Sequence, residues 1–122
     1  MTYVAISIGA VLGANARFLV GGWVADRLGA SFPFGTFIIN VTGSLLIGIV
    51  LTLSTERLTP DWFRPLLAIG FRGSYTTFST FSYETLALVQ GGSIGYAALN
   101  VTASVGAAFI GVYAGTVLAR MI

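Results

Sequence analysis

The sequence has 122 residues, of which 56% are hydrophobic and only 8% are charged, and its formal net charge is +2. Soluble domains carry about 25% charged residues, so this composition indicates a membrane protein. The small excess of positive charge gives no reason to expect a nucleic-acid partner. Cysteine and histidine are absent, which removes disulfides and the commonest acid–base and metal-binding side chains, so we do not expect an enzyme.

Apolar segments of helical length follow one another at residues 2–25, 34–54, 65–90 and 94–119. Roughly 20 apolar residues span the hydrocarbon core as a helix. The runs are unbroken, whereas a membrane barrel would need short alternating strands. The sequence therefore predicts an all-α membrane protein, with four transmembrane helices forming a single domain over residues 1–122.

The first segment carries small residues and one arginine at steps of about four residues: Gly9, Gly13, Arg17 and Gly21. A Gly-x-x-x-Gly spacing lets helix backbones approach closely in a membrane, and we favour this interpretation for the first two glycines. Arg17 is the only charge before Asp26 and Arg27, where we expect the helix to end.

The second segment contains no charge, and one of its faces carries Thr36, Asn40, Ser44, Gly48 and Thr52. The complementary face is made of large apolar residues, which suit contact with lipid. Asn40 is unusual because a carboxamide deep in an uncharged membrane helix costs free energy unless it has a partner. Polar groups in such places usually mark a pathway or a specific contact.

The third segment contains residues that weaken a helix near its middle. Gly70 and Gly73 flank Arg72, and the β-branched pair Thr76-Thr77 follows. We expect a break over residues 73–77, where the freed backbone carbonyls could bind a cation. Discontinuous membrane helices are a known way to build such sites.

Beyond this break, Phe78 and Phe81 share one helical face and Ser79 shares another with Ser82. Every residue from Ser74 to Tyr83 except these two phenylalanines carries a hydroxyl group. Hydroxyl donors and the positive edges of phenyl rings favour a small anion over a cation, as does a buried Arg17. The alternative is that the hydroxyls bond to their own helix and the rings face lipid.

The fourth segment has a small and polar face formed by Tyr96, Asn100, Ser104, Ala107 or Ala108, Gly111 and Gly115. For the two glycines we again favour close helix packing. The two polar side chains, Asn100 and Ser104, add donors to those of Asn40 and the third segment.

The motif Gly70-Phe71-x-Gly73-x-x-Thr76-Thr77-Phe78-Ser79-Thr80-Phe81-Ser82 resembles the signature of the Fluc family of fluoride channels, the CrcB-like proteins. The resemblance extends to Gly13-Ala14-x-x-Arg17-Phe18, to Gly35-Thr36-x-x-x-Asn40-x-x-Gly43-Ser44, and to Asn100 and Ser104. It thus covers essentially the whole chain, and the run from Thr76 to Ser82 is its most specific part.

This resemblance implies an antiparallel, dual-topology homodimer in the inner (plasma) membrane, which exports fluoride passively through two pores. It also implies a structural sodium ion on the backbone carbonyls of Gly73 and Thr76. The candidate ion pathway comprises Arg17, Asn40, Thr77, Phe78, Ser79, Thr80, Phe81, Glu84, Asn100 and Ser104. Fluoride, sodium, membrane lipid and a second copy of the chain are the expected partners.

Two other functions stay open at this point. A small four-helix, dual-topology transporter would need a carboxylate inside the membrane, and Glu84 is the one candidate. A non-conducting membrane assembly subunit would use the same small and polar faces for packing alone.

Overall fold

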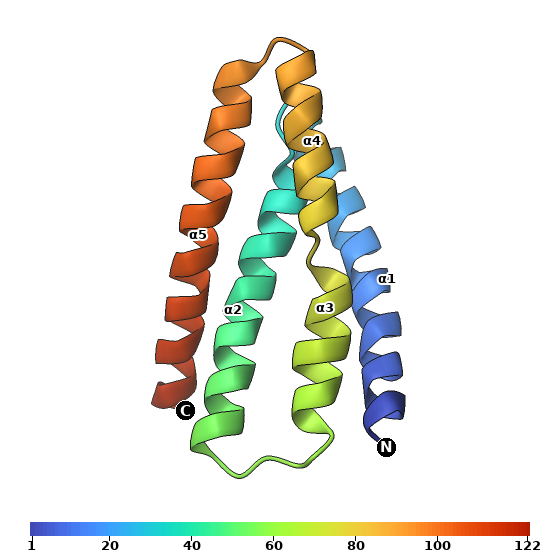
Figure 1. Cartoon of the computed structure of the whole chain (residues 1–122), viewed down its shortest axis with the longest axis vertical. Helices are drawn as coiled ribbons and strands as arrows, with labels where there is room; N and C mark the ends of the chain where they lie inside the picture. Colours follow the sequence, from blue (N-terminus) through green and yellow to red (C-terminus); the bar gives the residue numbers. More distant parts are fainter.

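The computed structural model describes residues 1–122 and contains helices but no strands (Figure 1). Three helices are long and apolar enough to cross a membrane: α1 (Thr2–Leu28), α2 (Phe34–Glu56) and α5 (Ile94–Met121). The remaining segment consists of the π-helix η1 (Pro65–Phe71), α3 (Arg72–Tyr75) and α4 (Phe78–Gln90). Both termini lie at the same end as the loop between α2 and η1 (Figure 1).

The long helices extend two or three residues beyond the expected ends, and charged residues near these ends have local partners. α1 continues through Asp26 and Arg27, and the Arg27 guanidinium lies 4.8 Å from the centre of the Trp23 ring. The helix ends at Gly29, whose φ of 79° favours glycine. At the opposite end of the molecule, Arg120 of α5 pairs with Glu56 of α2 at 2.8 Å.

The backbones of α1 and η1 are in contact where the two helices cross, because glycines occupy the contact positions. A Cβ atom added at Gly9 would clash with the carbonyl oxygen of Leu66, and one at Gly13 would clash with that of Phe71. A Cβ atom at Gly70 of η1 would in turn clash with the backbone of α1. These contacts support the packing interpretation of the glycines in the first segment.

α2 makes its most extensive contact with α5, and glycines again allow it. A Cβ atom at Gly48 would clash with the Val112 carbonyl oxygen, and one at Gly115 would clash with that of Leu45. Gly111 lies close to the α2 backbone in the same crossing. The small faces of α2 and α5 therefore bring these two helices together.

The third segment is interrupted between α3 and α4. Thr76 and Thr77 have extended backbone angles, with φ and ψ of −81° and 155° and of −149° and 122°, respectively. Before this interruption, η1 and α3 pack on α1, whereas α4 beyond it packs on α5. The interruption thus moves the chain from one neighbouring helix to another, and it lies beside the N-terminal half of α2 (Figure 1).

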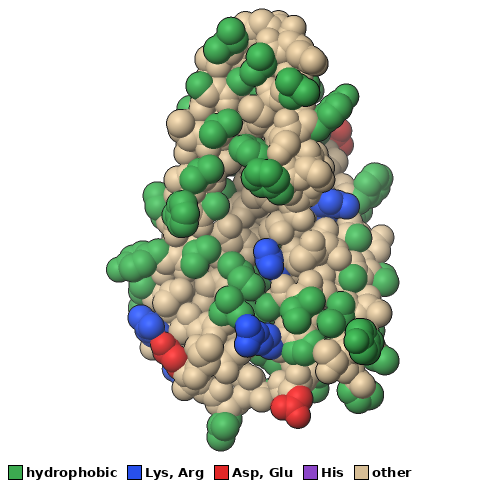
Figure 2. All heavy atoms as spheres, viewed as in Figure 1, with side chains coloured by type: hydrophobic (Ala, Val, Ile, Leu, Met, Phe, Trp, Pro, Cys, Tyr) green, Lys and Arg blue, Asp and Glu red, His purple; other side chains and the backbone are tan.

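Most large apolar side chains remain exposed on the single chain, and only 20 of 122 residues are buried. Figure 2 shows hydrophobic side chains along the whole length of one face, with few charged groups among them. A soluble domain of this size would hide many more of them, so lipid or a second protein chain must cover this surface.

Candidate ion pathway

The hydroxyls at the interruption cap the start of α4. The Thr77 hydroxyl oxygen accepts a hydrogen bond from the Thr80 backbone N–H at 3.2 Å and donates to the Thr80 hydroxyl at 3.1 Å. The Ser79 hydroxyl lies 3.4 Å from that of Thr77. This end of α4 carries the partial positive charge of a helix N-terminus, which favours a nearby anion.

Asn40 of α2 holds the interrupted backbone in place. Its Oδ1 accepts a hydrogen bond from the Thr77 N–H at 3.0 Å, while its Nδ2 donates to the Thr77 carbonyl at 3.1 Å. The carboxamide therefore satisfies both polar groups of a residue that has left the helix. Only one of the two Nδ2 hydrogens is used within the chain, so the other is free to donate.

A cleft of about 240 Å³ runs beside this contact, and we call it the phenylalanine cleft. Its walls come from α2, α3, α4, α5 and the two interruption residues, and include Asn40, Ser44, Arg72, Thr76, Thr77, Phe78, Phe81 and Ser104. The two rings are tilted by 45° with their centres 5.6 Å apart. Phe78 is 79% exposed, so the cleft is open on one side of the single chain.

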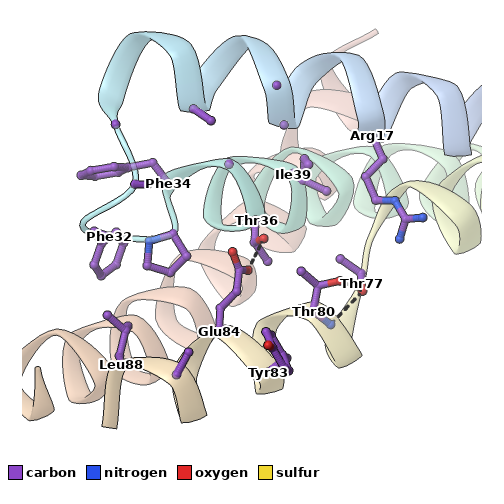
Figure 3. Close-up of a pocket in the computed structure, with 18 of the residues that line it drawn as sticks. Arg17, Phe32, Phe34, Thr36, Ile39, Thr77, Thr80, Tyr83, Glu84 and Leu88 are labelled. Atoms are coloured by element: carbon purple, nitrogen blue, oxygen red, sulfur yellow. Dashed lines mark hydrogen bonds between the residues drawn. The ribbon is translucent and has the colours of Figure 1, made fainter. Parts of the chain in front are cut away.

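A second, wider cleft of about 640 Å³ lies between α1, α2 and α4, and we call it the wide cleft. Arg17 reaches from α1 towards Thr77 and Thr80 (Figure 3). Glu84 lines the same cleft and accepts a hydrogen bond from the Thr36 hydroxyl at 2.5 Å. Thr77 lines both clefts, so the interruption lies between them.

Asn100 is almost completely buried, with 1% of its surface exposed. Its Nδ2 donates to the Thr85 hydroxyl at 2.9 Å, and its Oδ1 accepts a hydrogen bond from the Ser104 hydroxyl at 3.2 Å. Asn100 thus joins α5 to α4 and lines neither cleft, whereas Ser104 lines the phenylalanine cleft.

The structure divides the predicted pathway residues into three groups. The phenylalanine cleft contains Asn40, Thr77, Phe78, Phe81 and Ser104, and the wide cleft contains Arg17, Thr77, Thr80 and Glu84. Ser79 and Asn100 line neither cleft, although both are hydrogen-bonded to residues near the pathway.

Sequence reasoning assigned no role to three residues that the structure places in a cleft or in a hydrogen bond to a predicted pathway residue. Thr36 belongs to the polar face of α2, and its step of four residues from Asn40 was the available signal. Arg72 was visible as a charge inside an apolar segment. Nothing in the sequence pointed to Thr85, because its role depends on the position of Asn100 in another helix.

The structure corrects the expected role of Gly73, which was to weaken the helix at the start of the break. Its backbone lies within α3, its φ is not positive, and a Cβ atom would meet nothing within 4 Å. Backbone freedom within one chain therefore does not explain this glycine.

These membrane-length helices, exposed apolar surfaces and central polar clefts define a multi-pass helical membrane protein. Residues 4–116 match the family model described as "CrcB-like protein, Camphor Resistance (CrcB)". The chain belongs to this CrcB-like family.

Proteins from several bacteria are similar to this chain over essentially its whole length. It is 47% identical to the fluoride-specific ion channel FluC of Roseiflexus sp. (strain RS-1), with 100% of this chain and 99% of that protein covered. It is 46% identical to the protein of the same name from Acidobacterium capsulatum, with 100% and 98% covered. The corresponding protein of Solibacter usitatus is 44% identical, with 98% and 99% covered. These relatives are named as channels and not as enzymes.

Proposed function

We propose that this chain forms a fluoride-selective channel in the plasma membrane, which lets fluoride leave the cell passively and so lowers cytoplasmic fluoride. The observation that carries this proposal is the phenylalanine cleft, in which two rings face polar donors and no carboxylate is present. The relatives named fluoride-specific ion channel support the choice of ion.

The chemistry of the cleft suits a small anion. Fluoride holds its water tightly, so a pore must offer hydrogen-bond donors as the ion loses that water. The free Nδ2 hydrogen of Asn40 supplies a donor on the wall of the cleft, whereas the Ser104 hydroxyl, which also lines it, already donates to Asn100 Oδ1. The edges of Phe78 and Phe81 carry partial positive charge, and their size keeps the path narrow.

We infer that a second copy of the chain closes the phenylalanine cleft, which is open beside Phe78. We infer an antiparallel homodimer, because the arginines at the two ends give only a shallow preference for one orientation. Arg57, Arg64 and Arg120 lie towards the end that holds the termini, and Arg27 lies towards the other.

A structural sodium ion fits the carbonyls left free by the interruption. The Thr76 carbonyl accepts no hydrogen bond within the chain, and the Thr77 N–H that would normally bond the Gly73 carbonyl donates to Asn40 instead. Unwound carbonyls of this kind coordinate sodium in membrane proteins. Gly73 and Thr76 would hold the ion, whose charge would bring carbonyls of two chains together.

Fluoride efflux from liposomes tests the channel proposal. Purified protein is reconstituted into vesicles loaded with potassium fluoride, and valinomycin carries the balancing potassium while an electrode measures fluoride release. We expect rapid fluoride release and little chloride release from matched vesicles. Release no faster than from protein-free vesicles would leave a non-conducting assembly subunit as the better function.

Two further measurements test the assembly. Because the chain contains no cysteine, a single one introduced in the loop after Glu56 can be labelled from one side of intact cells. Labelling of about half the chains is expected from antiparallel insertion, and labelling of all or none would contradict it. A dimer held by sodium should melt at a higher temperature in sodium than in potassium salts, and equal melting would argue against the ion.

A further inference from the structure

Arg72 is the one charged residue that lines the phenylalanine cleft. Its Nε donates a hydrogen bond to the Ala68 carbonyl of its own helical segment at 3.4 Å, and no carboxylate pairs with it. The ion pair of this chain lies elsewhere, between Arg120 and Glu56. The terminal Nη donors of Arg72 and its full charge are therefore available to an anion.

The position of Arg72 in the membrane makes an unpaired charge costly. It follows Pro65, the first residue of η1, by seven positions, so it lies beyond the first helical turn of the segment. Charged side chains at such depth almost always face a bundle interior or a water-filled cavity, and they mark ion pathways. The phenylalanine cleft supplies such a cavity.

Arg72 is also tied to the interruption itself. Its carbonyl accepts hydrogen bonds from the Thr76 backbone N–H and from the Thr76 hydroxyl, each at 3.0 Å. Arg17 lines only the wide cleft and Arg72 only the phenylalanine cleft, while Thr77 lines both. Each of the two clefts that share Thr77 is therefore lined by one arginine.

We propose that Arg72 recruits the anion into the phenylalanine cleft, on the side of the interruption that holds α3. This inference rests on the proposed channel function. Its positive charge raises the local anion concentration beside Phe78 and Phe81, as charged residues lining a low-dielectric cleft do. Arg72 thereby complements Arg17, which has the same effect in the wide cleft.

Arg72→Gln removes the charge and keeps a polar side chain of similar reach. A charge about 10 Å from the ion, in surroundings between protein and water in dielectric constant, corresponds to about a fivefold change in ion occupancy. We expect the variant to release fluoride from liposomes about fivefold more slowly when fluoride is dilute. The matched control is Arg64→Gln, which makes the same change at an exposed residue outside both clefts and should release fluoride normally.

Arg72→Lys allows the charge to be removed after the protein has folded. The sequence contains no lysine, so this substitution introduces the only lysine side chain. Fluoride release should be close to that of the unmodified protein before acetylation and about fivefold slower afterwards. Arg64→Lys, acetylated in the same way and checked by mass spectrometry, should show no change.

Three results would overturn the inference. Unchanged release from Arg72→Gln and from acetylated Arg72→Lys would mean that the guanidinium extends to the lipid headgroups instead. Failure of the acetylating reagent to modify Arg72→Lys, while Arg64→Lys is modified, would mean that residue 72 does not face an open cleft. An unmodified protein that releases no fluoride would remove both the channel proposal and this one, whereas normal release with unaffected variants would remove only the role of Arg72.

Discussion

Asn40→Asp changes one atom of the contact that holds the interruption and replaces a donor with a negative charge. The carboxylate can still accept the Thr77 N–H, which lies 3.0 Å from Oδ1. It cannot donate to the Thr77 carbonyl, 3.1 Å from Nδ2, and it also removes the free hydrogen that faces the phenylalanine cleft. The substitution therefore tests the contact and the pathway together.

The expected magnitude follows from these two losses. One missing hydrogen bond costs about 1 kcal/mol of stability. A carboxylate about 4 Å from the passing ion repels it by about 4 kcal/mol at an effective dielectric constant near 20, and by about 1 kcal/mol in bulk water. The corresponding reduction in fluoride release lies between about fivefold and about a thousandfold, because each 1.4 kcal/mol is a factor of ten.

The assay is fluoride release from liposomes, with size-exclusion chromatography to verify that the variant is assembled. Asn40→Ala is the matched control, since it removes both hydrogen bonds to Thr77 without adding a charge. We expect a smaller reduction for this control than for Asn40→Asp. Equal reductions would show that the negative charge adds nothing to the loss of the carboxamide, and release at the normal rate from Asn40→Asp would show that Asn40 is a packing residue outside the pathway.

Phe78→Ile and Phe81→Ile should each slow fluoride release at least about tenfold without preventing dimer formation, because isoleucine lacks the positive ring edge; normal release from both folded variants would remove the rings from the mechanism. Thr76→Ser should leave assembly intact because the carbonyl remains, whereas Gly73→Val should yield folded monomers, since its side chain finds open space within one chain and would obstruct only a second copy. Chromatography that shows dimers for both would count against a cation site at the dimer axis. Gly43→Ala should lower stability by about 1–3 kcal/mol, because its Cβ would clash with the Thr76 Cγ2 atom. Adding Thr76→Ser, which deletes that atom, should restore part of the melting temperature, and no recovery would refute this explanation.

The class of protein could be predicted from the sequence because it depends on composition and on the length of the apolar segments. Neither of these depends on how the helices pack. A chain with 8% charged residues and several apolar segments of membrane length has few alternatives to a helical membrane protein. Residues that weaken a helix were equally visible at Gly70, Gly73 and the Thr76-Thr77 pair. The structure has extended backbone at Thr76 and Thr77, but both glycines lie within helical turns.

The roles of individual polar residues were harder to foresee, because they depend on partners from other helices. Asn40 could be recognised as a polar residue needing a partner, yet nothing in its own helix shows that both ends of its carboxamide bind Thr77. In the sequence, Asn100 resembled Asn40, because it too is a carboxamide on the polar face of an apolar segment. Its side chain is occupied by Thr85 and Ser104 and lines neither cleft.

By itself, the sequence determined that this chain belongs in a membrane, where its segments lie, and which side chains could serve an anion, since these depend on residue type and spacing. Only the tertiary structure decided which donors are already engaged and which face a cleft. Glycine contacts set how closely α1 meets η1 and how closely α2 meets α5. The interruption then directs α4 away from α1 and onto α5, which places Phe78 and Phe81 in one cleft with Ser104, with Arg72 beside them. Such positions arise from contacts between helices distant in the chain, and no local pattern encodes them.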